Sequence, residues 1–212
     1  MIKKEKKEGT QTAAPGKSKL DSETIKTNLT TLQYEIIQAI GRGDYSYLVD
    51  VGGLENLNQD FTITEEKIPP LHIACASGNY GMVQMLLFNQ SCKVNKVDIH
   101  GNNALHVAAE HGFLDIIKLL RERGCYFENS LDGTTGLHMA ARRGHVEVAR
   151  YILEESNVKL DARKTNGFQA LHLAALKGHL DMVQFLEAQG ADLADRAPPT
   201  DVSPLYLAAK SG

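Results

Sequence analysis

Eight histidines and three cysteines are the residues of this chain whose side chains could bind a metal ion or take part in catalysis. Four of the histidines recur at intervals of 34, 32 and 34 residues, namely His72, His106, His138 and His172. If each histidine lies on its own stacked element, about 8–10 Å from the next, neighbouring copies cannot share a zinc ion at ligand distances of about 2 Å. The spacing therefore predicts a structural repeat rather than a metal site.

The remaining reactive side chains form no recognisable catalytic pattern. Cys75, Cys92 and Cys125 lack the short spacing of metal-binding or redox-active pairs. No nucleophile, base and orienting acid stand at a recognisable spacing, and no glycine-rich loop of the phosphate-binding kind is present. We therefore expect a chain without enzyme activity, cofactor or metal.

The periodic histidines belong to a longer repeated unit. Each stands in a Leu-His-x-Ala sequence, with a fifth, altered copy at residues 205–208, and a glycine follows each alanine four residues later. In residues 101–120 that glycine is followed by apolar residues at helical spacing, namely Leu114, Ile116, Ile117, Leu119 and Leu120. Each unit is predicted to form two short helices, and neither helix can bury its apolar face unless the units stack.

This pattern resembles the ankyrin-repeat family, whose repeat of about 33 residues carries a Thr-Pro-Leu-His-x-Ala signature. The resemblance covers residues 36–212. It implies an all-α fold, an ankyrin-repeat solenoid of stacked helix-turn-helix units with projecting turns, the finger loops. It also implies that the signature histidines are structural clamps. Thr135 keeps the signature threonine, whereas Pro69, Asn103 and Gln169 replace it, so we expect those turns to be less rigid.

The repeat register predicts how the chain is divided. It gives a charged N-terminal tail (1–30), a degenerate capping repeat (31–63), four full repeats (64–97, 98–129, 130–163 and 164–197) and a partial repeat (198–212). We expect the tail to be disordered, because its polar composition cannot offset the entropy lost on ordering. The partial repeat indicates either a fragment of a longer protein, which we favour, or a truncated cap.

Glycine marks the expected ends of the second helices. Gly124 and Gly190 stand where a left-handed residue commonly ends a helix. The repeat at 130–163 lacks such a glycine and has one extra residue there. We expect Asn157 to take the place of the glycine, and we expect a looser loop.

Composition excludes several classes of function. The net charge of −3, the absence of tryptophan and an aromatic content of 6% argue against binding of nucleic acid. No apolar stretch approaches the roughly 18 residues of a membrane span, so we expect no membrane insertion. The N-terminus lacks the apolar core of a secretory signal. Together with the unpatterned cysteines, these features predict an intracellular protein, cytoplasmic rather than nuclear.

The resemblance also indicates where a partner would bind. In ankyrin-like repeats the finger-loop tips and the exposed side of the first helix line a concave groove and are free of packing duty. By register the groove residues are Ile99, His100, Asn102, Glu110, His111, Leu131, Asp132, Thr134, Arg142, Arg143, Thr165, Asn166, Phe168, Leu176 and Lys177. Apolar tips beside an arginine pair resemble an interface hot spot, although isolated exposed apolar residues and arginines are normal on any surface.

These expectations favour a non-catalytic module that binds a partner protein through the groove. The arginine pair suggests a partner with an acidic or amphipathic segment, because guanidinium groups bind carboxylates with paired hydrogen bonds. The alternative is the N-terminal regulatory domain of a larger effector, such as an ion channel, an enzyme or a ubiquitin-ligase adaptor.

Overall fold

The computed structural model describes residues 34–50, 68–88 and 92–211 of the chain. The predicted tail at 1–30 lies outside these residues. In the described part the chain is helical, and the pairing of Ala197 with Val202 is an isolated bridge between loop residues. The prediction of an all-α ankyrin-type solenoid is thus confirmed.

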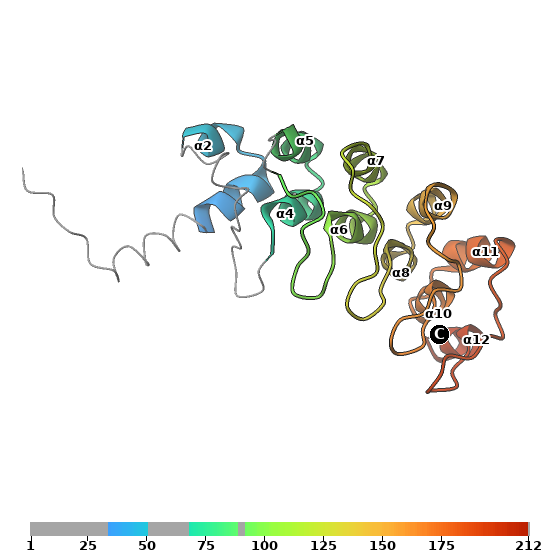
Figure 1. The fold of residues 1–212 in the computed structure, drawn as a ribbon. Coiled ribbons are helices and arrows are strands. Elements are labelled where there is room, and N and C mark those ends of the chain that lie inside the picture. Colours follow the sequence, from blue (N-terminus) through green and yellow to red (C-terminus); the bar gives the residue numbers. More distant parts are fainter. Residues whose placement is uncertain (1–33, 51–67, 89–91, 212) are drawn as a thin grey trace, which may run out of the picture.

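The helices form two rows along a curved array (Figure 1). The inner row consists of α4 (Pro70–Ser77), α6 (Ala104–His111), α8 (Gly136–Arg143), α10 (Ala170–Leu176) and α12 (Pro204–Ser211). The outer row consists of α2 (Tyr45–Asp50), α5 (Tyr80–Phe88), α7 (Leu114–Glu122), α9 (Val146–Glu155) and α11 (Leu180–Ala188). A helix over residues 34–42 precedes α2. The finger loops project beyond the inner row, on the side away from the outer helices.

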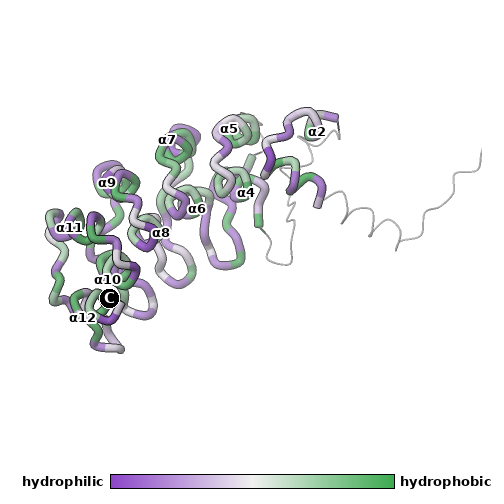
Figure 2. Tube along the Cα trace, turned by 180° about the vertical axis from the view of Figure 1, so that it is seen from behind, coloured by the Kyte–Doolittle hydropathy of each residue, from purple (hydrophilic) through white to green (hydrophobic). Residues whose placement is uncertain are grey.

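Stacking of successive units buries the apolar faces of both rows. From α4 to α12 each inner helix contacts the next inner helix, and α5, α7, α9 and α11 make the corresponding outer contacts. Leu105, Ile117, Leu120 and Leu137 are fully buried between units. Figure 2 shows the apolar residues along the helices and polar residues in much of the loops. Burial between neighbours therefore holds the array together, as expected for a solenoid.

The signature histidines confirm the structural role that was predicted for them. His106 illustrates the arrangement: its Nδ1 accepts a hydrogen bond from the backbone N of Asn103 at 3.2 Å, and its Nε2 donates to the carbonyl of Thr134 at 3.2 Å. The Nε2 atoms of the other three donate in the same way to Asn102, Phe168 and Val202. The rings of His106, His138 and His172 therefore fix the start of their own helices, and all four rings fix the finger loop of the next repeat.

The residues that replace the signature threonine differ in the hydrogen bonds that they make to the first turn of the following helix. The side chain of Asn103 accepts hydrogen bonds from the backbone N of Leu105 and His106, so it caps α6 as fully as Thr135 caps α8. Our expectation of a weaker turn was therefore wrong at Asn103. Pro69 has no N–H to donate, and the buried Nδ1 of His72 accordingly has no hydrogen-bond partner.

Helix ends follow the predicted glycines except in one repeat. Gly124 and Gly190 adopt positive φ angles of 81° and 100°, as predicted. After α9, however, Ser156 is extended with a φ of −138°. Asn157, which is among the described residues, does not adopt a positive φ. The prediction for Asn157 was wrong, because the chain leaves the helix through an extended residue instead of a left-handed turn.

Candidate protein-binding groove

The finger loops are joined to one another by backbone hydrogen bonds. The N–H of Leu131 donates to the carbonyl of His100 at 3.0 Å, and the N–H of Thr165 donates to the carbonyl of Asp132 at 2.8 Å. Gly101 shows how closely the loops approach: a Cβ atom there would lie 2.8 Å from the N of Leu131, and its φ is 80°. The finger loops therefore form one continuous edge, which holds their tips in fixed positions.

An acidic residue stiffens two of the described finger loops, Asp98 in the first and Asp132 in the second. In the second described loop Asp132 accepts hydrogen bonds from the hydroxyl of Ser130 at 2.6 Å and from the N–H of Thr134 at 3.0 Å, and it pairs with Lys164 at 3.0 Å. Partial burial raises the pKa of the Asp132 carboxyl, but hydrogen bonds, first of all from Ser130 and Thr134, lower it well below its usual range. Asp132 therefore stays ionised, and its oxygens already accept hydrogen bonds from Ser130 and Thr134 and pair with Lys164.

Two of the three apolar tips that the sequence predicted are exposed. Leu131 exposes 78% of its surface and Ile99 exposes 45%. Phe168 is only half-buried, because its ring stacks on that of His172 with 5.4 Å between centroids. The carbonyl of Phe168 accepts the hydrogen bond from His138. Phe168 thus stabilises the loop rather than standing free at its tip.

Thr134 and Asn102 also differ from the expectation that groove residues are free of packing duty. Thr134 exposes only 4% of its surface, and its carbonyl accepts the hydrogen bond from His106. Asn102 is half-buried and donates through its side chain to Asp98 at 3.1 Å. Both belong to the frame of the loops, so Thr134 offers a partner no accessible side chain.

Arg142 and Arg143 are tied across the repeats by a single carboxylate. Oε1 of Glu110 accepts hydrogen bonds from Nη2 of Arg142 at 2.5 Å and from Nη2 and Nε of Arg143 at 2.8 and 3.3 Å. The side chains of Arg142, Arg143 and Glu110 are 39%, 56% and 21% exposed. Partial burial raises the pKa of Glu110, but the hydrogen bond from Arg143 and the charges of both arginines outweigh it and lower that pKa. The expectation that groove residues are free of contacts between repeats was therefore wrong for both arginines.

A hollow opens between these arginines and the next repeat. It has a volume of about 540 Å³ and is lined by Arg142, Arg143, Lys177 and His179. Nε2 of His179 donates to the carbonyl of Arg142 at 3.0 Å, which fixes one wall. Lys177 is exposed, and the described residues show no ion pair for it. Sequence reasoning missed His179, although its place directly after a repeat glycine was the available signal.

The other predicted groove residues lie on the inner helices and on the finger loops. His111 is exposed, stacks on Phe113 and donates from Nδ1 to the carbonyl of Val107. Leu176 is half-buried, and its carbonyl accepts from the hydroxyl of Ser211. His100, Thr165 and Asn166 are exposed on the finger loops.

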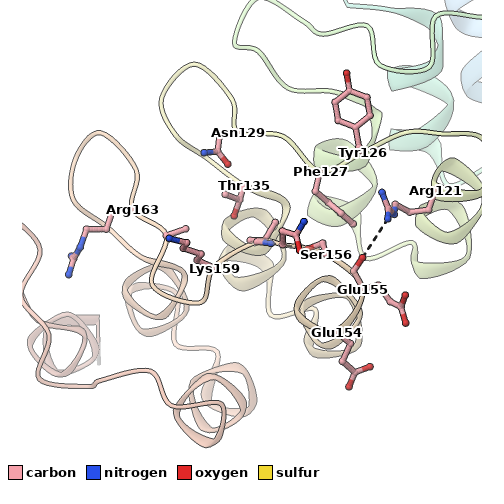
Figure 3. A pocket seen from close by; sticks show the side chains of 13 residues that line it. Arg121, Tyr126, Phe127, Asn129, Thr135, Glu154, Glu155, Ser156, Lys159 and Arg163 are labelled. Carbon is pink, nitrogen blue, oxygen red and sulfur yellow. Dashed lines mark hydrogen bonds between the residues drawn. The ribbon is translucent and has the colours of Figure 1, made fainter.

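A second, larger hollow lies away from the predicted groove residues (Figure 3). Its volume is about 710 Å³, and it lies between the end of α9 and the loop that follows α7. Arg121 donates there to the carbonyls of Cys125 and Glu155, and Arg163 pairs with Asp195 at 2.7 Å. Both guanidinium groups thus already bind acceptors within the protein. Ser156 and Asn157 line this hollow. They lie where the repeat at 130–163 lacks a glycine and has one extra residue, and that irregularity was the signal in the sequence for this site.

The described residues contain neither a metal site nor a membrane span. No group of three or more His, Cys, Asp or Glu side chains in this part of the chain could hold a metal ion. None of the described helices combines the length and apolarity needed to cross a bilayer.

Comparison with known proteins agrees with the architecture. The family model described as ankyrin repeats (3 copies) matches residues 36–130 and 123–197. A probable serine/threonine-protein kinase of Dictyostelium discoideum is 40% identical over 82 residues, which are 35% of this chain and 8% of that protein.

Two further relatives are a channel and a toxin. The transient receptor potential cation channel subfamily A member 1 of Homo sapiens is 33% identical over 74 residues, 34% of this chain and 7% of the channel. Alpha-latroinsectotoxin-Lt1a of Latrodectus tredecimguttatus is 36% identical over 84 residues, 37% of this chain and 5% of the toxin. The matched part of the chain spans less than a tenth of each of these relatives.

Proposed function

The chain belongs to the ankyrin-repeat family, and from this premise we propose that it binds a partner protein along its concave groove without catalysing a reaction. The observation that carries the proposal is the combination of exposed apolar finger tips with a row of basic side chains. Leu131 and Ile99 supply the apolar tips. Arg142, Arg143 and Lys177 supply the basic row at the ends of consecutive inner helices.

Charge complementarity identifies the kind of segment that the groove would accept. The cationic groups around the hollow would steer an acidic or amphipathic segment, and the finger tips would cover its apolar residues. Protein is favoured over nucleic acid because the chain carries a net charge of −3, which opposes the phosphate backbone.

A charge reversal at Lys177 tests the groove most cleanly. Lys177 is exposed and forms no ion pair within the part of the chain that the structure describes, so Lys177→Glu should leave the fold intact while repelling an acidic segment. Co-precipitation from cell extract should then lose the partners that wild type recovers. The matched control is Lys118→Glu on the outer helix α7, which changes the net charge equally away from the groove. Equal recovery by both folded variants would rule out the groove as the binding surface.

A second candidate is that the repeats form the regulatory part of a larger effector. Its support is that the matched segment covers under a tenth of each relative, and that two of those relatives are named as a kinase and a channel. Sequencing the transcript that encodes this chain tests the idea. A coding region that continues into an effector domain is expected, and a stop codon directly after Gly212 would contradict it.

We also propose an intracellular location, in the cytoplasm rather than the nucleus. Cys75, Cys92 and Cys125 are all free, which suits a reducing compartment. A fluorescent fusion of the full chain should fill the cytoplasm, and exclusive nuclear signal would contradict this assignment.

A further inference from the structure

We propose that the hollow lined by Arg142, Arg143, Lys177 and His179 binds a phosphate monoester carried by a phosphorylated segment of the partner protein. The inference rests on the proposed function, since it takes the groove as the binding surface and names the chemical group that is bound there. Four nitrogen-bearing side chains from two neighbouring repeats converge on this one hollow of about 540 Å³.

The charge at the hollow fits a dianion. Arg142, Arg143 and Lys177 bring three positive charges, and the carboxylate of Glu110 compensates one of them. Two of these three positive charges remain uncompensated. A phosphate monoester carries a charge of about −1.5 to −2 at neutral pH, and a partner carboxylate carries only −1. The phosphate therefore matches the uncompensated charge, and a single aspartate or glutamate does not.

Donor groups remain available for the oxygens of such a ligand. The hydrogen bonds of Arg142 to Glu110 use only its Nη2, and those of Arg143 use Nη2 and Nε. Among the described residues, the Nη1 of each arginine therefore remains available to a ligand. Lys177 adds an ammonium group that is exposed. Guanidinium and ammonium groups are the side chains that proteins use most for phosphate, because they combine charge with several directed N–H donors.

Glu110 makes the site selective for the more strongly charged ligand. Its carboxylate already occupies the position between the two guanidinium groups that a partner carboxylate would take, and it is held by three hydrogen bonds. A monoanion from a partner must compete with this tethered group. A dianion gains more from the same cations, so it can bind beside Glu110 or displace it. Glu110 is therefore a specificity-determining residue as well as a link between repeats.

A phosphorylated protein segment fits the surroundings better than other sources of phosphate. Nucleic acids and anionic bilayers present many negative charges over a wide area. The acidic groups of Glu110 and of Asp132 on the neighbouring finger loop would oppose such a surface. One phosphorylated residue brings its charge to the hollow alone, and its flanking residues can contact the exposed tip of Leu131.

Inorganic phosphate is the probe that tests the site directly. The full chain is titrated with phosphate and, separately, with acetate at constant ionic strength, and the arginine Nε–Hε and backbone amide resonances are followed by nuclear magnetic resonance. Phosphate should shift the resonances of Arg143, Lys177 and His179, whereas acetate should not. Lys177→Gln should weaken phosphate binding by about tenfold, the usual scale for losing one charge-assisted hydrogen bond.

Two variants control this titration. Lys118→Gln removes an equal charge from the outer helix α7 and should leave phosphate binding unchanged. Glu110→Gln removes the internal competitor, so it should tighten phosphate binding several-fold and allow acetate to bind. Equal phosphate affinity in wild type and Lys177→Gln, or equal weakening by Lys118→Gln, would overturn the site. Acetate binding to wild type as tight as phosphate binding would overturn its selectivity.

Phosphatase treatment separates this inference from the proposed function. Partners that wild type co-precipitates should be lost when the extract is first dephosphorylated. If Lys177→Glu loses the partners and dephosphorylation does not, the groove binds a segment that is not phosphorylated and this inference fails alone. If neither treatment changes recovery, the groove itself is not the binding surface. Binding to vesicles of phosphatidylserine in place of protein would overturn the assignment to a phosphorylated segment.

Discussion

Single side chains of this protein serve the stack and the groove at the same time. His138 is the clearest case, because its ring accepts from the N–H of Thr135 and donates to the carbonyl of Phe168 in the next repeat. Its burial lowers its pKa to about 4. A protonated ring could not accept the first of these hydrogen bonds, so the clamp requires neutral histidine.

The stability of the array should therefore fall in mild acid. Burial lowers the pKa values of His72, His106 and His172 as well as that of His138. The unfolded chain, with ordinary histidine pKa values near 6.5, binds more protons than the folded chain below that pH. The contribution of the four neutral histidines to the free energy of unfolding is fully present above about pH 6.5, and it is lost progressively as the pH falls towards 4. Urea unfolding at pH 7.0 and 5.0 measures this loss.

The variant His138→Gln provides the control for this pH effect. Glutamine cannot take up the proton, so the variant should be less stable at pH 7 but should lose less stability between pH 7 and pH 5. An identical loss in the variant and in wild type would show that His138 does not contribute.

The link between Glu110 and the two arginines makes a second prediction about side chains. Changing Arg142 and Arg143 together to Glu would place three carboxylates together, so the variant should lose stability, on the order of 1 kcal/mol for such partly exposed groups. A thermal melt measures the loss, and adding Glu110→Arg should restore part of it. No change in the double variant would mean that the three side chains are not paired in solution.

The helices depend on their neighbours more than on their own sequences. The buried residues of α7 are Ile116, Ile117, Leu119 and Leu120, and they lie against the units on both sides. Helices of nine residues are marginal in isolation, so tertiary burial must supply most of their stability. The finger loops gain from the same principle, since the hydrogen bonds that order them come from adjacent repeats.

Truncation of a buried leucine in α7 should be costly. Leu120 is fully buried and Leu119 exposes 4%, so replacing either by Ala should cost about 2–5 kcal/mol. Chemical denaturation of each variant measures the loss in the free energy of unfolding. Leu131→Ala, at the exposed finger tip, is the matched control and should change stability little. Equal stability of Leu120→Ala and Leu131→Ala would contradict the observed packing.

The whole array should be most stable in its middle. Central units have neighbours on both sides, whereas α12 contacts the inner helix α10 and leaves Leu205 and Tyr206 67% and 57% exposed. Stability in a solenoid is roughly the sum of unit and interface contributions, so a unit with one interface opens first.

Hydrogen exchange checks this gradient in the chain of 212 residues. Amides of α12 should exchange with little protection, whereas those of α6 and α7 should be protected to a degree that approaches global unfolding. Equal protection of α12 and α6 would contradict the idea that neighbouring interfaces determine local stability.

The sequence by itself determined the repeated architecture and its core. Apolar residues such as Leu105 and Leu120 recur with the period of the unit, and a face of that kind can be buried only by stacking. The same spacing argued against a zinc site shared by the signature histidines, and the resemblance to the ankyrin-repeat family implied their role as clamps. The absence of a glycine after α9 also marked the place where the chain leaves the helix through an extended residue, Ser156.

Only the tertiary structure decided which groove residues are free to bind. Glu110 lies 32 and 33 residues from Arg142 and Arg143, and no local pattern shows that its carboxylate joins them. Thr134 and Phe168 stand at loop positions by register, yet a backbone clamp buries one and a ring stack half-buries the other. Contacts between units depend on side-chain conformations across each interface, and the period of the sequence carries no information about them.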